Sequence, residues 1–296
     1  MPIVLSEYIR QNFYTHFCVG SLPHKDPGAA LDFIMRRPWI IPFWPELPAV
    51  SRQELMLPRA LRALENEWNG YRKDEASGLY ALKSFLDKNG RAPLLKCQLP
   101  GPLTIVQAMP GRGDWSEKLK VAVKACLKQV YWQWEFLRDS AAALLFVFDE
   151  PFFGFSEKHE QQILEAYTYL YVRTTELGCS AGIHTCAALE AALFSLPMDL
   201  YSFDGLKTAL ESGSALCEAL RAVIQRKAVL ACGVFPACCR TEFQAALMAG
   251  EQSFRRLSAL LKPVSGGQLL LSAACGHAAT DESWLQALYD YKLKEA

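Results

Sequence analysis

The chain has no excess of charge of either sign and no long apolar run. Its 296 residues include 31 lysines and arginines and 31 aspartates and glutamates. This balance argues against nucleic acid and anionic membranes as partners, because both require a basic face. No apolar stretch reaches the roughly 18 residues expected of a membrane-spanning helix, and residues 1–11 lack the apolar core of a signal peptide. We therefore expect a cytoplasmic protein that binds neither nucleic acid nor membrane.

Two common sequence signatures are also missing. The segment from Gly20 to His24, after the first apolar run, fits neither glycine-rich phosphate-binding fingerprint. The ten cysteines include no CxxC pair, and in a reducing compartment they do not indicate a disulfide framework. Most of them are expected to be small buried side chains, so each cysteine proposed as a metal ligand needs a positional reason.

Eight short apolar runs alternate with amphipathic stretches of helical spacing. Continuous apolar runs are typical of parallel strands covered on both faces, although a short run alone does not exclude a buried helix. The alternation predicts an α/β fold, a single (β/α)8 TIM barrel over residues 1–296, with a doubly wound open sheet as the competing architecture. The runs are 17–20, 40–43, 93–97, 144–148, 180–183, 200–203, 229–234 and 269–272, and the helices expected most clearly are 116–137, 156–176, 241–261 and 281–294.

Polar side chains follow nearly every run, where the strands of such a barrel end and its active site is built. Because these ends meet at one mouth, residues far apart in the chain are expected to share a site. We expect Ser21, His24, Glu46, Gln98 and Asp149 to bind substrate there.

The strongest metal signal is His184 and Cys186 after the fifth run with Cys275 after the eighth. Zinc prefers sulfur and imidazole nitrogen, and a site with three protein ligands leaves a fourth position open for substrate. Taken singly, the His-x-Cys pair could be a chance arrangement and Cys275 a buried thiol, but together they favour Zn²⁺. Asp204 follows the sixth run and is a weak fourth ligand, a partner that orients a ligand, or only a helix cap.

The adjacent carboxylates Asp149 and Glu150 end a strongly apolar run, so at least one of them is expected to face the mouth. The alternative is that both cap the next helix or pair with arginines. We expect Asp149, Glu150 and His277 to take part in catalysis, with Glu150 or His277 taking up a proton. The neighbours Cys238 and Cys239 cannot easily chelate one ion, so a structural or incidental role is favoured for them.

These residues stand in the order found in cobalamin-independent methionine synthases. The motifs that carry the resemblance are Gly20-Ser21-Leu22-Pro23-His24, Gly101-Pro102-Leu103-Thr104, Asp149-Glu150-Pro151, His184-Thr185-Cys186 and Cys275-Gly276. More broadly, the chain resembles the superfamily shared with uroporphyrinogen decarboxylase and with zinc methyltransferases acting on corrinoid proteins. The resemblance covers nearly the whole chain and corresponds to the catalytic C-terminal half of these synthases.

The resemblance implies a TIM barrel in which His184, Cys186 and Cys275 bind zinc. It also implies that Asp149 holds the amino group of homocysteine and that Ser21 contacts the polar end of this amino acid. The zinc glutamate of the family has no clear counterpart, and Asp204 is the nearest candidate. The expected activity is methyl transfer from a methylfolate or a corrinoid protein to a small-molecule thiol. A non-catalytic zinc-thiolate barrel that binds a partner is the alternative, and a decarboxylase-like enzyme is a further one.

Overall fold

The structure is a computed structural model that describes residues 4–111, 113–151, 153–154, 157–206, 211–239 and 242–292. Six parallel strands form one sheet in sequence order, which confirms an α/β fold with a parallel sheet. The last six predicted runs lie in these strands. They are β1 (Ala92–Pro100), β2 (Ala141–Asp149), β3 (Ser180–Thr185), β4 (Leu200–Asp204), β5 (Val229–Phe235) and β6 (Leu269–Ala273).

The first two predicted runs, 17–20 and 40–43, are not regular strands among the described residues, so the prediction of eight regular strands is confirmed only in part. Both runs are short, and Pro42 has no N–H to donate to a neighbouring strand. The chain here makes single parallel bridges between the two edges of the sheet. These bridges join His16 to Leu271 of β6, His16 to Ile40, and Phe43 to Lys96 of β1.

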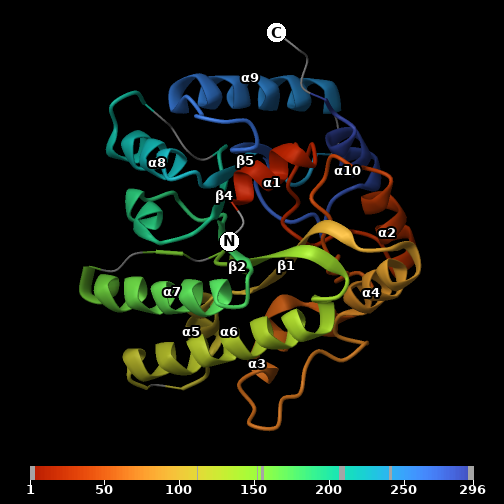
Figure 1. Cartoon of the computed structure of the whole chain (residues 1–296), viewed down its shortest axis with the longest axis vertical. Coiled ribbons are helices and arrows are strands. Elements are labelled where there is room, and N and C mark those ends of the chain that lie inside the picture. Colours follow the sequence, from red (N-terminus) through yellow and green to blue (C-terminus); the bar gives the residue numbers. More distant parts are fainter. Residues whose placement is uncertain are drawn as a thin grey trace.

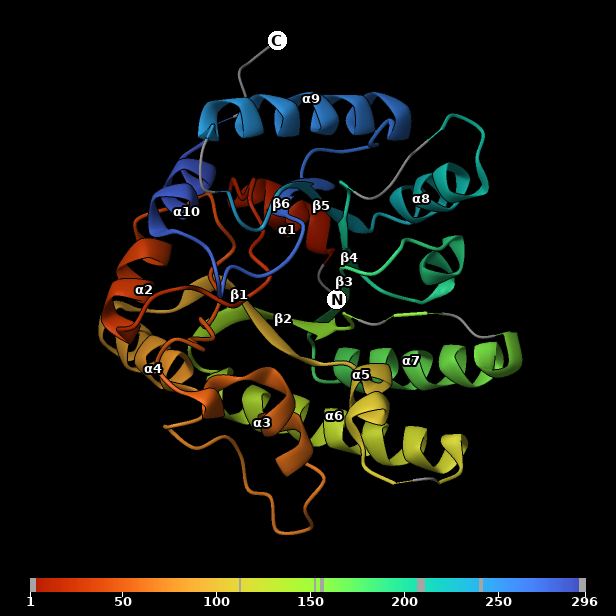
Figure 2. The same ribbon diagram turned by 180° about the vertical axis from the view of Figure 1, so that it is seen from behind.

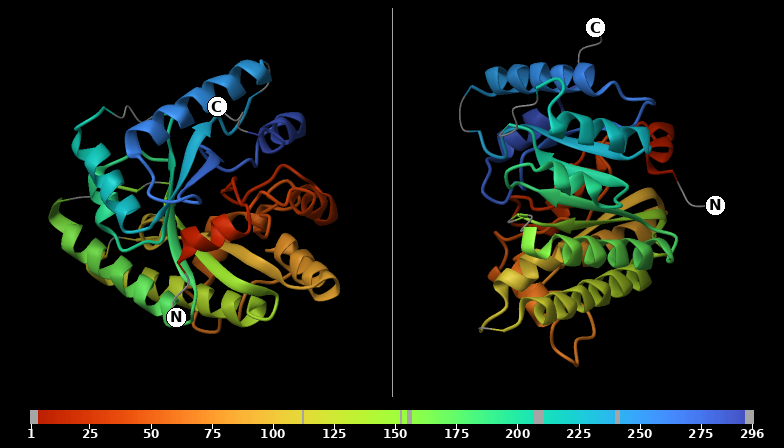
Figure 3. Two further views of the ribbon diagram at one scale, coloured as in Figure 1. Left: turned by 45° about the horizontal axis from the view of Figure 1, so that its top comes forward. Right: turned by 90° about the vertical axis from the view of Figure 1, so that its left-hand side faces the viewer.

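The long helices lie on the outer side of the sheet and surround it, as both panels of Figure 3 show. In Figure 1, α8 and α9 lie at one end of the molecule and α6 and α7 at the other, with α2 and α4 along one side; Figure 2 shows the same arrangement from behind. The helices are α1 (Leu5–Gln11), α2 (Pro27–Met35), α3 (Met56–Arg62), α4 (Ser77–Asn89), α5 (Pro102–Ala108), α6 (Trp115–Leu137), α7 (Glu160–Thr175), α8 (Ala215–Gln225), α9 (Phe243–Leu261) and α10 (Glu282–Tyr289), with short 3₁₀ turns η1 (Arg52–Glu54), η2 (Glu157–His159) and η3 (Ala191–Ser195).

The four clearly expected helices correspond to α6, α7, α9 and α10. Amphipathic spacing located them because one face of each helix packs on the sheet while the other face meets solvent. The described part of α7 begins at Glu160 and that of α9 at Phe243. The expected boundary residues Ser156, Thr241 and Lys294 lie outside the described residues.

Alternation along the strands divides the core into two layers. Side chains of a strand point in turn to opposite faces, so in β1 Leu94 belongs to the inner apolar cluster and Leu95 to the larger cluster under the helices. Leu5 and Ile9 of α1 also belong to the inner cluster, so α1 covers the amino ends of the strands. The opposite ends of the strands are left to carry polar groups.

The described residues contain no helix that is long and apolar enough to cross a membrane.

Candidate metal centre

Three of the predicted metal ligands meet at the carboxyl ends of β3 and β6. The ligand atoms of His184, Cys186 and Cys275 all lie within 4.8 Å of one another. His184 is the fifth of six residues in β3, Cys186 follows that strand directly, and Cys275 lies just beyond β6. Although 89 positions separate the two cysteines, their Sγ atoms are 3.7 Å apart. Parallel strands end on the same side of the sheet, which is why such distant residues meet.

The imidazole of His184 is oriented for binding through its outer nitrogen. Nδ1 lies 2.9 Å from Oγ of Ser202 on β4, whereas Nε2 is buried without a hydrogen-bond partner. If Nδ1 carries the proton and donates it to Ser202, Nε2 presents a lone pair toward the two sulfurs. A ligating histidine is usually held in this way by a partner on its other nitrogen.

The two thiols differ from the buried cysteines elsewhere in the chain. Cys186 and Cys275 are both half-buried. The neighbouring side chains of Cys186 and then of His184 lower the pKa of Cys275 to about 4, which favours the thiolate at neutral pH. Burial instead raises the pKa of Cys97 and Cys232. A thiolate is the form of cysteine that binds metals.

The cluster opens into a cavity of about 260 Å³ at this end of the sheet. The cavity wall contains both acidic and apolar groups, with Leu55 and Met56 forming part of the rim. Six of the residues predicted for the site line it: Ser21, Glu46, Asp149, His184, Cys186 and Cys275. The structure therefore brings three of the four predicted metal ligands together with three predicted substrate-binding residues.

Asp149 ends β2 and is a buried acid of the cavity wall. The residue is 5% exposed, and its Oδ1 is buried without a hydrogen-bond partner. Burial raises the pKa of this carboxyl well above its ordinary value, while the nearby ammonium of Lys96 acts in the opposite direction. An orphaned carboxylate oxygen in a cavity wall is suited to accept a hydrogen bond from a ligand amine.

Glu46 and Ser21 form another part of the wall, where an isolated parallel bridge pairs their backbones. Glu46 is ion-paired with the buried guanidinium of Arg59, so its charge is offset before any ligand binds. Ser21 lies against the turn after Cys275, and a Cβ at Gly276 would be 2.1 Å from Ser21 Oγ. Glycine at that position is required for the serine and the cysteine to share the cavity.

Glu150 and His277 lie outside the cavity wall. The Glu150 carboxylate accepts the N–H groups of Leu103, at 2.8 Å, and Thr104, at 2.7 Å, and so caps α5; it also accepts the hydroxyl of Tyr167. His277 is 1% exposed and uses both nitrogens, with Nδ1 2.9 Å from the carbonyl of Ala237 and Nε2 3.2 Å from the Tyr289 hydroxyl. The alternative that both carboxylates cap the next helix is met only in part, because Glu150 alone caps a helix and α5 precedes it in the chain. The catalytic roles expected for these two residues stay predictions.

His24, Gln98 and Asp204 are also absent from the described cavity wall. Gln98 donates from Nε2 to the carbonyl of Trp44 at 2.8 Å, and the ring centroid of His24 lies 5.6 Å from that of Phe33. Asp204 Oδ1 accepts the N–H of Leu206 at 3.0 Å, and Asp204 is not part of the metal cluster. Substrate binding by the first two and zinc binding by Asp204 likewise stay predictions.

Three residues that shape the site were not predicted from the sequence: Ser202, Arg59 and Lys96. Lys96 left a signal, because it is a lysine inside the apolar run 93–97. Ser202, by contrast, lies between Tyr201 and Phe203 in an apolar run, where a single serine gives no signal of a metal site. The exposed Cys238 lies outside the cluster, with its Sγ 3.8 Å from the carbonyl of Ala279.

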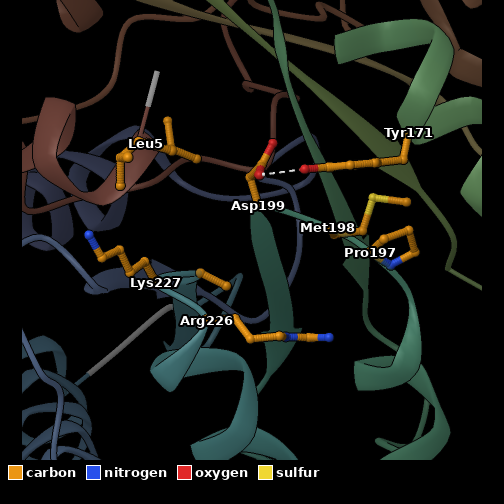
Figure 4. Close-up of a pocket in the computed structure, with 9 residues that line it drawn as sticks. Leu5, Tyr171, Pro197, Met198, Asp199, Arg226 and Lys227 are labelled. Carbon is orange, nitrogen blue, oxygen red and sulfur yellow. Dashed lines mark hydrogen bonds between the residues drawn. The ribbon is translucent and has the colours of Figure 1, made fainter. Parts of the chain in front are cut away.

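A second hollow of about 310 Å³ lies at the other end of the sheet (Figure 4). Its wall comes from α1, α7 and the segments before β4 and β5, and the Tyr171 hydroxyl donates to Asp199 across it at 3.2 Å. None of the residues predicted for the site lines this hollow. The carboxyl ends of the strands therefore remain the candidate functional face, as expected for a barrel-type fold.

Comparison with known proteins shows similarity in fold. No protein-family model and no curated protein matches the chain. Among solved structures, a B12-independent methionine synthase from Shewanella sp. W3-18-1, in complex with selenomethionine, is similar with a TM-score of 0.50 and 16% identity. The match covers 72% of this chain and 63% of that one. A protein named IolI, with a bound zinc atom, has a TM-score of 0.47 and 10% identity, over 93% of this chain and 95% of that one. The first of these likenesses shows a TIM-barrel-like fold.

Proposed function

We propose that the chain is a single (β/α)8 barrel domain that acts as a zinc-dependent methyltransferase, moving a methyl group to a small thiol. The observation that carries the proposal is the convergence of one imidazole and two thiols, with all ligand atoms within 4.8 Å of one another, in the wall of a cavity. Three protein ligands are typical of zinc sites that do chemistry, because a fourth position stays open. In this barrel the bridged segments around His16 and Ile40 take the place of the first two strands.

The residues present fit a zinc ion by their chemistry. The donor set is N, S, S, and the buried Nε2 of His184 has no hydrogen-bond partner within the protein. An unpartnered buried nitrogen costs free energy, and a metal ion would remove that cost. The lowered pKa of Cys275 supplies one ligand in the form that zinc requires.

When bound, zinc supplies a Lewis acid that lowers the pKa of a substrate thiol from its ordinary value of about 8.5. The protein side chains would hold the rest of the substrate. Asp149 offers its unpartnered Oδ1 to a substrate ammonium, and Ser21 offers a hydroxyl beside it. Glu46 offers the part of its carboxylate that Arg59 leaves unused. A thiol that also carries an amino group, such as homocysteine, matches this wall.

The methyl donor would approach over the apolar rim. Leu55 and Met56 line the cavity, and Leu55 is 43% exposed, so the rim offers apolar contact to a methylfolate or to the corrinoid of a partner protein. Fixing the thiol and the methyl carbon in line can supply roughly 7–11 kcal/mol of the acceleration. The cavity of about 260 Å³ is suited to a small acceptor rather than to the whole donor.

Metal analysis of purified protein tests the proposal, with Cys275→Ser as the decisive variant. We expect about one zinc per chain in the wild type and a clear loss in Cys275→Ser. Cys238→Ser is the matched control, because Cys238 lies outside the cluster. The Cys238→Ser protein should bind as much zinc as the wild type. Full zinc retention in Cys275→Ser would exclude Cys275 as a ligand. Assays with methylcobalamin and methyltetrahydrofolate against several thiols then identify the donor and the acceptor.

Cobalt substitution separates an enzyme from a non-catalytic zinc-thiolate barrel. A thiol that enters the open coordination position changes the cobalt–thiolate absorption, whereas a closed four-ligand site does not respond. We expect a thiol-dependent change in the wild type. An unresponsive spectrum combined with full metal content would favour the partner-binding alternative.

A further inference from the structure

A lysine lies inside the barrel, beneath the floor of the cavity. Lys96 is fully buried in β1. The register of β1 and β2 pairs Lys96 with Leu145 and Pro100 with Asp149. Because side chains alternate between faces, Lys96 lies on the same inner face as Asp149, toward the amino end of the strands. The ammonium does not line the cavity itself.

The Lys96 ammonium joins β1 to the irregular segment that carries the cavity wall. Nζ donates a hydrogen bond to the carbonyl of Val19 and lies 3.2 Å from Oε1 of Gln98. It also lies 5.1 Å from the ring centroid of Phe17 and 5.6 Å from that of Phe43, a placement that attracts a cation. Val19 lines the cavity two residues before Ser21. Lys96 therefore fixes the part of the chain where regular strand pairing is absent.

The two buried cations near the cavity differ in how their charge is compensated. Among the described lysines and arginines, only Lys96 and Arg59 are buried. Arg59 is ion-paired with Glu46, whereas Lys96 shares the inner face of the sheet with Asp149 without a direct ion pair. Burial lowers the pKa of Lys96, and Asp149 is the strongest charged group acting in the opposite direction. A buried charge is tolerated when an opposite charge and hydrogen bonds compensate it.

We propose that Lys96 is a positioning residue of the cavity, whose buried ammonium offsets the carboxylate of Asp149 and anchors the Val19–Ser21 segment. The role in substrate binding rests on the proposed function, whereas the charge pairing does not. Lys96 acts through Asp149 and Val19 and does not touch the ligand. Lys96 thereby helps to hold Asp149 where its unpartnered Oδ1 can accept a hydrogen bond from a substrate ammonium.

A double-mutant cycle on metal-free protein tests the charge pairing. Lys96→Met should lower the folding equilibrium constant on the order of a hundredfold or more, because it leaves a buried carboxylate without its partner. Adding Asp149→Asn should restore at least about tenfold of that loss, since the unpaired charge is then gone. Glu46→Gln should not restore it, because Glu46 has Arg59 as its partner. The exposed Lys124→Met is the control for loss of a lysine and should fold like the wild type.

If the effects of Lys96→Met and Asp149→Asn on the free energy of unfolding are additive, the proposal is overturned. If Lys96→Met fails to fold, a folded Lys96→Met/Asp149→Asn protein supports the pairing, and an unfolded one overturns it. Binding to cobalt-loaded protein supplies a readout that packing alone would not change. Wild type should prefer cysteamine to 2-mercaptoethanol, which carries no ammonium, and both Lys96→Met and Asp149→Asn should lose that preference. A coupled cycle in a protein whose cobalt spectrum ignores both thiols would uphold the pairing and reject the proposed function.

Discussion

Replacing Ser202 with alanine removes one contact behind the candidate metal centre and leaves all three ligands in place. Ser202 Oγ lies 2.9 Å from Nδ1 of His184, and the serine is 1% exposed. Loss of a group that orients a ligating histidine lowers metal affinity by about 10- to 100-fold. This corresponds to about 1.4–2.8 kcal/mol of binding free energy. We therefore expect Ser202→Ala to raise the Kd for zinc by that factor without changing the stoichiometry.

Competition with a chromophoric chelator at neutral pH, under reducing conditions, measures this change. Ser272→Ala is the matched control. Ser272 is also buried on the inner face of the sheet, but its hydroxyl donates to the carbonyl of Ala273 at 3.0 Å and not to a ligand. The control should bind zinc like the wild type. An unchanged Kd in Ser202→Ala would refute the argument that this hydroxyl orients the imidazole.

Three further predictions concern stability and can be checked by denaturant unfolding of metal-free protein. Arg59→Met should lower the free energy of unfolding by about 3–5 kcal/mol, because Glu46 is left buried and unpaired. A decrease below about 1 kcal/mol would show that the ion pair is solvated. Glu150→Ala should lower the free energy of unfolding by at least about 3 kcal/mol, since it removes the acceptor of two N–H groups of α5 and of the Thr104 and Tyr167 hydroxyls; a loss of activity with unchanged stability would instead indicate a direct catalytic role. Burial lowers the pKa of His16 from 6.5 to about 4, so its contribution is present above pH 6.5 and is lost as pH falls toward 4. His16→Gln should remove about 1.4 kcal/mol per pH unit of that dependence, and equal slopes in the two proteins would contradict this.

The sequence predicts the strands best where apolar runs are continuous. Runs from position 93 onward lie in β1–β6, because strands covered on both faces by other elements need apolar residues on both faces. The run 40–43 reads equally well as a strand, yet Pro42 lacks a donor and the chain makes only isolated bridges there. The amino-acid composition of an apolar run does not show whether it will form a regular strand or only a single β-bridge.

The ends of the runs predict which residues can meet, but not which way each side chain points. Asp149 and Glu150 are neighbours in sequence; the first enters the cavity and the second caps α5. Side chains alternate between the two faces of a strand, but in a run that is apolar on both faces hydrophobicity does not show which residues face inward. The sequence therefore could not predict which of the two carboxylates enters the cavity. Only the pairing of β2 with β1 and β3 determines which of its side chains face inward.

Charges buried within apolar segments were a signal that the sequence did contain. Lys96 interrupts an apolar run, and a charge at such a position requires a partner. Its partner cannot be read from local pattern, because Asp149 is 53 positions away in the printed sequence and approaches only through strand register. The partner of Arg59 also cannot be predicted from local sequence, because its ion pair with Glu46 depends on the tertiary fold of the segment between Phe43 and α4.

X-ray absorption of the zinc-loaded protein tests the central claim most directly, because it counts the atoms bound to the ion. We predict two sulfur ligands at about 2.3 Å and at least one imidazole nitrogen at about 2.0–2.1 Å, from Cys186, Cys275 and His184. Addition of a substrate thiol should raise the sulfur count from two to three. A spectrum with fewer than two sulfurs, or one that added thiol leaves unchanged, would contradict an open zinc site built from these three residues.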